Sequence, residues 1–294
     1  MKKVFLTLTV LLLVTLLAVS CGSDATVTTE ETTEAETITT TVTTTKEETI
    51  VTTEMTTPAE TTTAAPITTE APVTTTAPVT TEDNTPKVYP LDGKTFMFLG
   101  SSVTYGSASG GTSFVEFIKK EGNCNVIKEA VSGTTLVDNG ESSYVQRLVN
   151  NLGTTYKNAK VDHLIVQLST NDASQSKPLG RLSKETESSM MNTTTIIGAI
   201  EFIIAYAKET WGCNVSFYTG TKYDSTLYQR MVDSLYDIQE KWGIGIIDLW
   251  NDEEMNSVSE SKYKQYMSDP IHPTAIGYRV WWTPKFIEHL QKYE

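Results

Sequence analysis

Four short polar segments carry residue types that could perform acyl transfer. They read Gly-Ser-Ser-Val-Thr-Tyr-Gly at 100–106, Ser-Gly-Thr-Thr at 132–135, Ser-Thr-Asn-Asp at 169–172 and Asp-Pro-Ile-His-Pro at 269–273. Acyl transfer needs a nucleophilic hydroxyl, a base to accept its proton, a group to orient that base, and hydrogen-bond donors for the oxyanion. The four segments together contain all of these groups.

Ser102, His272 and Asp269 are the candidate nucleophile, base and orienting group. Ser102 lies in a glycine-flanked turn, and His272 is the only one of three histidines expected in a loop beside a carboxylate. Asp269, three residues earlier across a proline-containing turn, could reach Nδ1 of His272 and fix its tautomer. We expect His163 to be a structural strand residue and His289 to face solvent on a helix.

Strands and helices alternate through residues 87–294. Short apolar runs predict strands at 95–99, 125–131, 163–168, 215–218 and 244–249. Helical spacing predicts helices at 114–120, 143–152, 196–207, 227–242 and 274–292, the last kinked or broken at Pro284. Such alternation indicates a parallel sheet covered by helices, with function in the loops at the carboxyl ends of the strands. Three of the four polar segments follow predicted strands.

At this point the globular part, residues 87–294, resembles the SGNH, or GDSL-type, hydrolase family. The family's Gly-Asp-Ser-Leu/Ile-Thr-x-Gly block is matched at 100–106, its oxyanion glycine falls on Gly133, and its oxyanion asparagine falls on Asn171. Its Asp-x-x-His pair falls on Asp269 and His272. The resemblance implies a flavodoxin-like three-layer α/β sandwich with a five-stranded parallel sheet. It also implies an oxyanion hole formed by the Ser102 and Gly133 N–H groups and the Asn171 amide.

The chain departs from the family pattern at three positions. Ser101 stands where the family has Asp, Ala130 where it often has Gly, and Ser169 where it often has Gly. None of these changes removes a group with a catalytic role, although Ser101 could weaken the support of the nucleophile turn. We expect Asp172 to be structural and to hold the Asn171 loop.

Two cysteines test the strand order that the resemblance implies. Cys124 precedes the second predicted strand and Cys213 the fourth. In the family order 2-1-3-4-5 these strands are separated by about 14 Å, because neighbouring strands lie about 4.8 Å apart. A disulfide needs Cα atoms within about 7 Å. We therefore expect two free thiols.

The N-terminal third is not globular in composition. Lys2 and Lys3 precede an apolar run at 4–19, which is shorter than a membrane-spanning helix. Ala-Val-Ser-Cys at 18–21 resembles a bacterial lipoprotein box, which implies a signal peptide at 1–20 and a lipid on Cys21. An ordinary secretory signal is the alternative. The protein is thus expected either on the outer face of the cytoplasmic membrane, held by lipid, or secreted.

Residues 21–86 are predicted to be a disordered linker. About two-fifths of residues 22–86 are threonine, and none is aromatic. This composition buries too little apolar surface to offset the entropy of ordering the chain. We interpret the segment as a spacer between the membrane and the globular domain, with binding to a cell-wall polymer as the alternative.

Charge and residue clustering exclude several function classes. The net charge of −13 and the lack of a basic patch argue against a nucleic-acid partner. We find no spacing of His, Cys or carboxylates typical of a metal site and no glycine-rich phosphate loop, so neither a metal nor a cofactor is expected. We expect a monomer.

The substrate is predicted less directly than the chemistry. We favour an extracellular serine esterase that removes small acyl groups, chiefly acetyl, from carbohydrate. A lysophospholipase or thioesterase is one alternative, and a surface module that binds carbohydrate without catalysis is another. The long segment at 172–193 is expected to be a lid or rim of the site, with Arg181, Met190 and Met191 beside the substrate.

Overall fold

The computed structural model describes residues 27–33, 36–44, 49–54 and 89–293, with side chains described for 89–293 only. The chain forms two compact units, Met1–Thr81 and Glu82–Glu294. The predicted signal peptide and Cys21 lie outside the described residues. No helix in the described ranges combines the length and apolar character needed to cross a membrane.

The described part of the first unit is a small antiparallel sheet. Its strands are β1 (Val27–Thr33), β2 (Glu36–Thr44) and β3 (Thr49–Glu54), and Val42 in β2 pairs with both Val27 and Val51. These strands lie within residues 21–86, the segment that the sequence predicts to be a disordered linker. Threonine and valine are β-branched and favour extended backbone, which accounts for strands in a segment with no aromatic residue. The rest of 21–86 lies outside the described residues.

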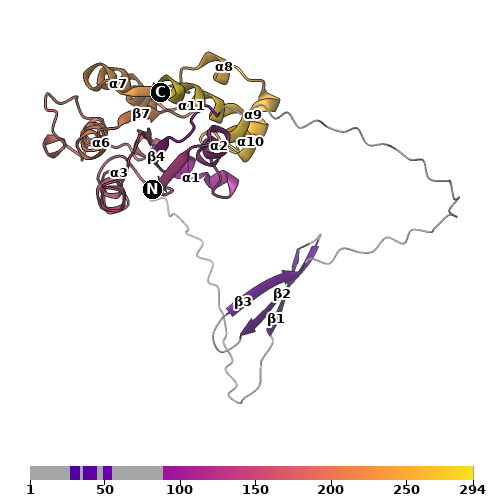
Figure 1. Cartoon of the computed structure of the whole chain (residues 1–294). Helices are drawn as coiled ribbons and strands as arrows, with labels where there is room; N and C mark the ends of the chain where they lie inside the picture. The colour runs from indigo at the N-terminus through magenta and orange to yellow at the C-terminus, as the bar shows by residue number, and fades with distance from the viewer. Residues whose placement is uncertain (1–26, 34–35, 45–48, 55–88, 294) are drawn as a thin grey trace, which may run out of the picture. The chain divides into compact units, whose positions relative to one another are not determined.

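The second unit is built on a five-stranded parallel sheet (Figure 1). Its strands are β4 (Thr95–Gly100), β5 (Asn125–Ala130), β6 (His163–Gln167), β7 (Asn214–Tyr218) and β8 (Gly245–Ile247). They lie in the order β5-β4-β6-β7-β8, with every neighbouring pair parallel. The predicted strands and the predicted order 2-1-3-4-5 are confirmed.

Helices connect the strands and cover both faces of the sheet. Between β4 and β7 they are α1 (Ser102–Tyr105), η1 (Ser107–Ser109), α2 (Phe114–Gly122), α3 (Tyr144–Arg147), η2 (Leu148–Leu152), α4 (Gly153–Thr155), α5 (Thr170–Ser174), η3 (Ser188–Met190) and α6 (Ile196–Trp211). After β7 come α7 (Thr226–Trp242), α8 (Glu253–Asn256), α9 (Glu260–Tyr266), α10 (Ala275–Gly277), η4 (Tyr278–Trp282), α11 (Thr283–Leu290) and η5 (Gln291–Tyr293). Of these, η2 and η4 are π-helical.

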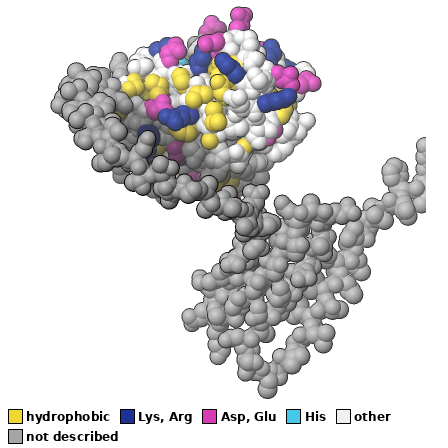
Figure 2. Space-filling model, turned by 90° about the vertical axis from the view of Figure 1, so that its right-hand side faces the viewer, with side chains coloured by type: hydrophobic (Ala, Val, Ile, Leu, Met, Phe, Trp, Pro, Cys, Tyr) yellow, Lys and Arg dark blue, Asp and Glu magenta, His cyan; other side chains and the backbone are white. Residues whose placement is uncertain are grey.

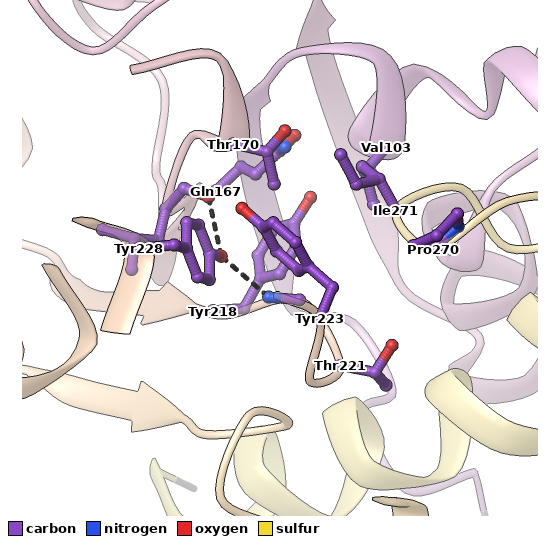
Figure 3. A pocket seen from close by; sticks show the side chains of 11 residues that line it. Val103, Gln167, Thr170, Tyr218, Thr221, Tyr223, Tyr228, Pro270 and Ile271 are labelled. Atoms are coloured by element: carbon purple, nitrogen blue, oxygen red, sulfur yellow. Dashed lines mark hydrogen bonds between the residues drawn. The ribbon is translucent and has the colours of Figure 1, made fainter. Parts of the chain in front are cut away.

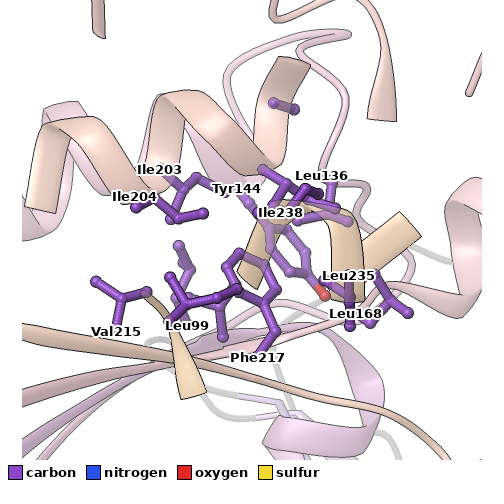
Figure 4. Close-up of a cluster of buried hydrophobic side chains, with 14 of the residues drawn as sticks. Leu99, Leu136, Tyr144, Leu168, Ile203, Ile204, Val215, Phe217, Leu235 and Ile238 are labelled. Carbon is purple, nitrogen blue, oxygen red and sulfur yellow. The ribbon is translucent and has the colours of Figure 1, made fainter. Parts of the chain in front are cut away.

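Alternate residues of β4 enter two separate cores, which makes the unit a three-layer sandwich. Leu99 packs with residues of α6 and α7 in the first core, part of which Figure 4 shows. Phe98 packs on the other face with Phe114 and Phe286, whose rings stack at a centroid distance of 4.1 Å. Side chains alternate between faces along a strand, so one short apolar run supplies both cores.

The C-terminal helix tests two expectations. The backbone stays helical on both sides of Pro284, since the π-helical η4 runs directly into α11. In place of the predicted kink or break, the helix has one widened π-helical turn before the proline. Thr283 Oγ1 donates to Tyr278 O at 2.8 Å and so satisfies a carbonyl in the widened turn. His289 is buried, whereas the sequence predicted that it faces solvent. Its Nε2 lies 2.9 Å from Ser216 Oγ, with which it forms a hydrogen bond.

Both cysteines of the second unit are free. Cys124 and Cys213 are buried and unpaired, as the strand order predicts. Burial raises the pKa of each thiol to about 11, so neither is a reactive thiolate near neutral pH.

Candidate active site

The turn after β4 presents the nucleophile at the start of a short helix. β4 ends at Gly100, and Ser102 is the first residue of α1. A Cβ on Gly100 would overlap the Thr104 side chain, so only glycine allows this tight turn. Gly106 ends α1 with φ of 86° and donates to Ser102 O at 2.9 Å. The turn thereby places Ser102, which is 8% exposed, at the carboxyl edge of the sheet.

Ser102, His272 and Asp269 form a continuous hydrogen-bonded series. Ser102 Oγ lies 2.8 Å from His272 Nε2, and His272 Nδ1 lies 2.8 Å from Asp269 Oδ2. These distances lie within the range in which a base can take a proton from a hydroxyl. The structure therefore brings together three residues that are up to 170 positions apart in the sequence.

The loop that carries the base is fixed by the carboxylate that orients it. Asp269 Oδ1 accepts from the N–H groups of Ile271 at 2.8 Å and His272 at 2.9 Å. Partial burial acts to raise the pKa of Asp269, but these hydrogen bonds and the one to His272 bring it below its usual value. The carboxylate is therefore ionised at neutral pH and holds the Nδ1–H tautomer of His272.

The predicted oxyanion residues lie in loops that contact each other. Gly133 has φ of 81°, a left-handed conformation that favours glycine. Asn171, in α5, donates from Nδ2 to Thr134 O at 2.9 Å. One N–H of that amide thus fixes the side chain beside the Gly133 loop, and its second N–H is available to a ligand.

Two buried charged residues hold the oxyanion loop in place. Asp172, which is fully buried, accepts from Leu136 N at 2.7 Å and Val137 N at 3.1 Å. Arg147 donates from Nη2 to Gly100 O at 2.8 Å and to Thr134 Oγ1 at 3.0 Å. Asp172 has the structural role expected for it. The role of Arg147 was not predicted; its signal is an arginine between apolar positions of a helix.

A small apolar cavity opens beside the nucleophile (Figure 3). Its volume is about 10 Å³, which is room for about one water-sized group. Val103, Thr170 and Ile271, which line it, each directly adjoin a member of the predicted site, because they neighbour Ser102, Asn171 and His272 in sequence. The far side is formed by aromatic rings, including those of Tyr218, Tyr223 and Tyr228.

The segment at 172–193, which the sequence predicts as a lid or rim, does not line this cavity. Met191 is buried in the core, while Met190 is 59% exposed. Neither they nor Arg181 is among the lining residues in the described part of the chain. Ser183 N donates to Glu201 Oε2 at 2.8 Å, and Ser188 N donates to Glu209 Oε1 at 2.8 Å. Ser183 and Ser188 thus anchor the segment on α6, while Thr193 O accepts from Asp138 N at 2.9 Å in the loop that follows Gly133.

Within residues 89–293, no group of three or more His, Cys, Asp or Glu side chains is arranged to hold a metal ion. The site as described contains a hydroxyl, an imidazole, a carboxylate and amide donors. These are the groups of a serine hydrolase.

Comparison with known proteins agrees with this geometry. The family model for the GDSL-like Lipase/Acylhydrolase family matches residues 98–280. The chain belongs to this family. The matched range includes Ser102, Gly133, Asn171, Asp269 and His272, so all five positions of this GDSL-like family member fall inside it. No curated protein is similar enough in sequence to match.

Solved structures similar to this GDSL-like family member share its fold at low sequence identity. A protein from Lactobacillus plantarum is 16% identical, with a TM-score of 0.54, over 69% of this chain and 96% of that one. A protein described as a GDSL-like lipase from Bacteroides ovatus is 15% identical, with a TM-score of 0.50, over 68% and 99%. A family two carbohydrate esterase from Clostridium thermocellum, solved with cellohexaose, is 13% identical, with a TM-score of 0.49, over 68% and 64%. At these identities, the similarity to the first two structures shows the fold alone.

Proposed function

We propose that this GDSL-like hydrolase is an exported serine esterase that removes small acyl groups, chiefly acetyl, from carbohydrate. The observation that carries the proposal is the Ser102–His272–Asp269 series beside a cavity of about 10 Å³. A methyl group is about as large as a water molecule, so the cavity suits the methyl of an acetyl ester.

The reaction would proceed in two steps through an acyl-enzyme. Ser102 Oγ attacks the ester carbonyl while His272 Nε2 accepts its proton, and the alcohol leaves with that proton. The Ser102 and Gly133 N–H groups and the Asn171 amide stabilise the oxyanion. Water then attacks the acyl group by the same route, releasing a carboxylic acid and restoring Ser102.

The cavity argues against a long acyl chain in the same position. Its walls include the buried side chains of Val103, Tyr218 and Tyr228. A chain of eight carbons could enter only if these residues moved, and displacing packed side chains typically costs 1–3 kcal/mol or more. This disfavours a lysophospholipase or thioesterase.

Two features support a carbohydrate as the alcohol part. Tyr105, at the end of α1, is 46% exposed, and an exposed tyrosine presents an apolar ring with a polar tip, which suits a sugar. Acidic and basic side chains are interspersed on the face that Figure 2 shows, so it does not present a single-sign surface for a charged polymer. The export signal predicted at 1–20 and Cys21 would place the site where extracellular glycans are found.

Hydrolysis of p-nitrophenyl acetate, butyrate and octanoate, with Ser102→Ala as control, tests the proposal. We expect turnover that depends on Ser102 and declines from acetate to octanoate, followed by release of acetate from acetylated glycans. A preference for octanoate would favour the lipid alternative. A folded protein that binds glycan equally well with or without Ser102, and turns over none of the esters, would be a binding module.

The role of the cavity can be tested separately with Ile271→Ala. This change enlarges the cavity but keeps the backbone N–H that binds Asp269, so the butyrate-to-acetate ratio of kcat/KM should rise about tenfold. Ile276→Ala is the matched control, because Ile276 is 56% exposed and does not line the cavity. An unchanged ratio in Ile271→Ala would place the acyl group elsewhere.

A further inference from the structure

Gln167, the last residue of β6, lies directly behind the nucleophile turn. It is 2% exposed, and its side-chain oxygen Oε1 accepts three hydrogen bonds. The donors are Ser101 N at 2.9 Å, Thr104 N at 3.3 Å and Thr104 Oγ1 at 2.9 Å. The nucleophile Ser102 lies between the two residues whose backbone N–H groups are bound.

Within residues 89–293, no other side chain accepts a hydrogen bond from the backbone N–H groups of Ser101 or Thr104. Ser101 occupies the N-cap position of α1 but makes no side-chain cap, and its buried hydroxyl has no hydrogen-bond partner within the described residues. The first N–H groups of a helix need acceptors from outside it. Gln167 supplies one acceptor from a neighbouring strand, and leaves the Ser102 N–H for the oxyanion.

The amide oxygen is itself part of a fixed network. Because the Thr104 hydroxyl donates to Gln167, it must accept from Tyr218 OH, 2.6 Å away. Tyr218 is fully buried on β7, the strand next to β6. Two strands of the sheet therefore set the position and orientation of α1.

We infer that Gln167 is a positioning residue for catalysis, which sets the places of the Ser102 hydroxyl and the Ser102 N–H through the start of α1. This inference rests on the proposed function, because it concerns the same nucleophile. An aspartate at position 101, as in the family pattern, could support the nucleophile turn, and Ser101 does not. Gln167 supplies that support with an uncharged acceptor. An uncharged acceptor adds no negative charge behind a site where an oxyanion forms.

The test compares Gln167→Met with Gln167→Glu in the full chain. Methionine is similar in size but has no acceptor, so kcat for p-nitrophenyl acetate should fall about 10- to 100-fold while KM changes less than about threefold. Glutamate keeps an acceptor oxygen, so Gln167→Glu should restore at least part of kcat. As the pH rises, the activity of Gln167→Glu should decline relative to that of the unaltered chain, because the ionised carboxylate opposes the oxyanion.

Two further variants separate positioning from folding. Gln239→Met is the matched control, because Gln239 also makes a hydrogen bond, from Nε2 to Ile244 O at 2.8 Å, but lies on α7. It should leave kcat unchanged. Tyr218→Phe removes the outer link to Thr104 but keeps the ring that lines the cavity, and should lower kcat about two- to fivefold with an unchanged butyrate-to-acetate ratio of kcat/KM, which tests the network even if Gln167→Met does not fold.

Covalent labelling distinguishes failure of this inference from failure of the proposed function. Ethyl p-nitrophenyl methylphosphonate forms an Oγ–P bond with Ser102 and releases p-nitrophenolate, while His272 accepts the serine proton. Slower labelling of Gln167→Met than of the unaltered chain supports the inference even if no acetyl ester is hydrolysed. Equal labelling rates and equal kcat in folded Gln167→Met and unaltered chains would overturn it.

Discussion

The two ends of the parallel sheet each hold a serine bound to histidine, yet only one end has the means for catalysis. At the carboxyl end, Ser102 contacts His272, whose other nitrogen is bound by Asp269. At the opposite end, Ser216 Oγ lies 2.8 Å from His163 Nε2 and 2.9 Å from His289 Nε2.

Accessibility and the orienting carboxylate separate the two clusters. The His272 side chain is 24% exposed, whereas Ser216 is fully buried. Nδ1 of His163 has no hydrogen-bond partner in the described part of the chain, so no carboxylate fixes its tautomer. A serine–histidine contact alone is thus not evidence of catalysis; a substrate path and an orienting group are also required.

The largest expected effect comes from removing each serine in turn. Ser102→Ala should lower turnover of p-nitrophenyl acetate by at least about 100,000-fold, because the nucleophile is lost. Ser216→Ala should leave kcat within about twofold but lower the free energy of unfolding by about 1–3 kcal/mol, because it leaves buried histidine nitrogens unpaired. Kinetics and urea unfolding of both variants measure this contrast. A loss of turnover in a well-folded Ser216→Ala protein would contradict the distinction between the two ends.

A smaller effect is expected from weakening the feature that only the carboxyl end has. Asp269→Asn retains the size of the side chain but no longer favours the Nδ1–H tautomer of His272. We expect kcat to fall by about 100- to 10,000-fold with little change in KM. Steady-state kinetics at saturating acetate ester measure it. Activity within about threefold of the unaltered chain would show that the backbone alone orients His272.

The smallest effect concerns stability at the other end. Burial lowers the pKa of His163 to about 3 and that of His289 to about 4. An unfolded chain binds these protons near pH 6.5, before the folded chain does, so stability should be full above about pH 7 and fall as the pH decreases toward 4.

We expect a loss on the order of 2–4 kcal/mol in the free energy of unfolding between pH 7.5 and 4.5, measured by urea unfolding. His289→Gln removes one of the two groups and should make this slope shallower. Asp269 serves as an internal reference, because its lowered pKa predicts a loss of stability only when the pH falls below the usual pKa range of an aspartate. Equal stability at the two pH values would show that the cluster readily accepts a proton.

Sequence patterns predicted the sheet and the close approach of Ser102, Asp269 and His272, because each has a local signal. Every predicted strand begins or ends within two or three residues of the strand described, since buried parallel strands are short apolar runs. Ser102, Asp269 and His272 lie in compact segments that match a known motif. The helix α9 was not predicted, because Glu260–Tyr266 has no apolar stripe. Its one sequence signal is the cap residue Ser259, which accepts from Lys262 N.

The supporting contacts were not predictable, because they join residues that are far apart in sequence. Gln167 is 66 positions from Ser101, and Asp172 is 36 positions from Leu136. The only sequence sign that Gln167 has a special role was its place as a polar residue at the end of an apolar strand. Register between neighbouring strands decides which backbone group such a side chain meets, and composition does not encode that register.

The anchoring of the segment at 172–193 has a consequence for kinetics at lipid surfaces. Glu201 is fully buried and accepts from Ser183 N, Trp242 Nε1 and Lys241 Nζ, the last at 2.6 Å. Lifting the segment would take the Ser183 N–H from Glu201 and the Ser183 carbonyl from Lys241, and a hydrogen bond to a charged group typically contributes about 1.5–3 kcal/mol. The segment that the sequence predicts as a lid or rim is therefore held to the body of the second unit. Hydrolysis of a short-chain ester should rise smoothly with its concentration through the critical micelle concentration, without the abrupt increase given by enzymes whose lids open on an interface.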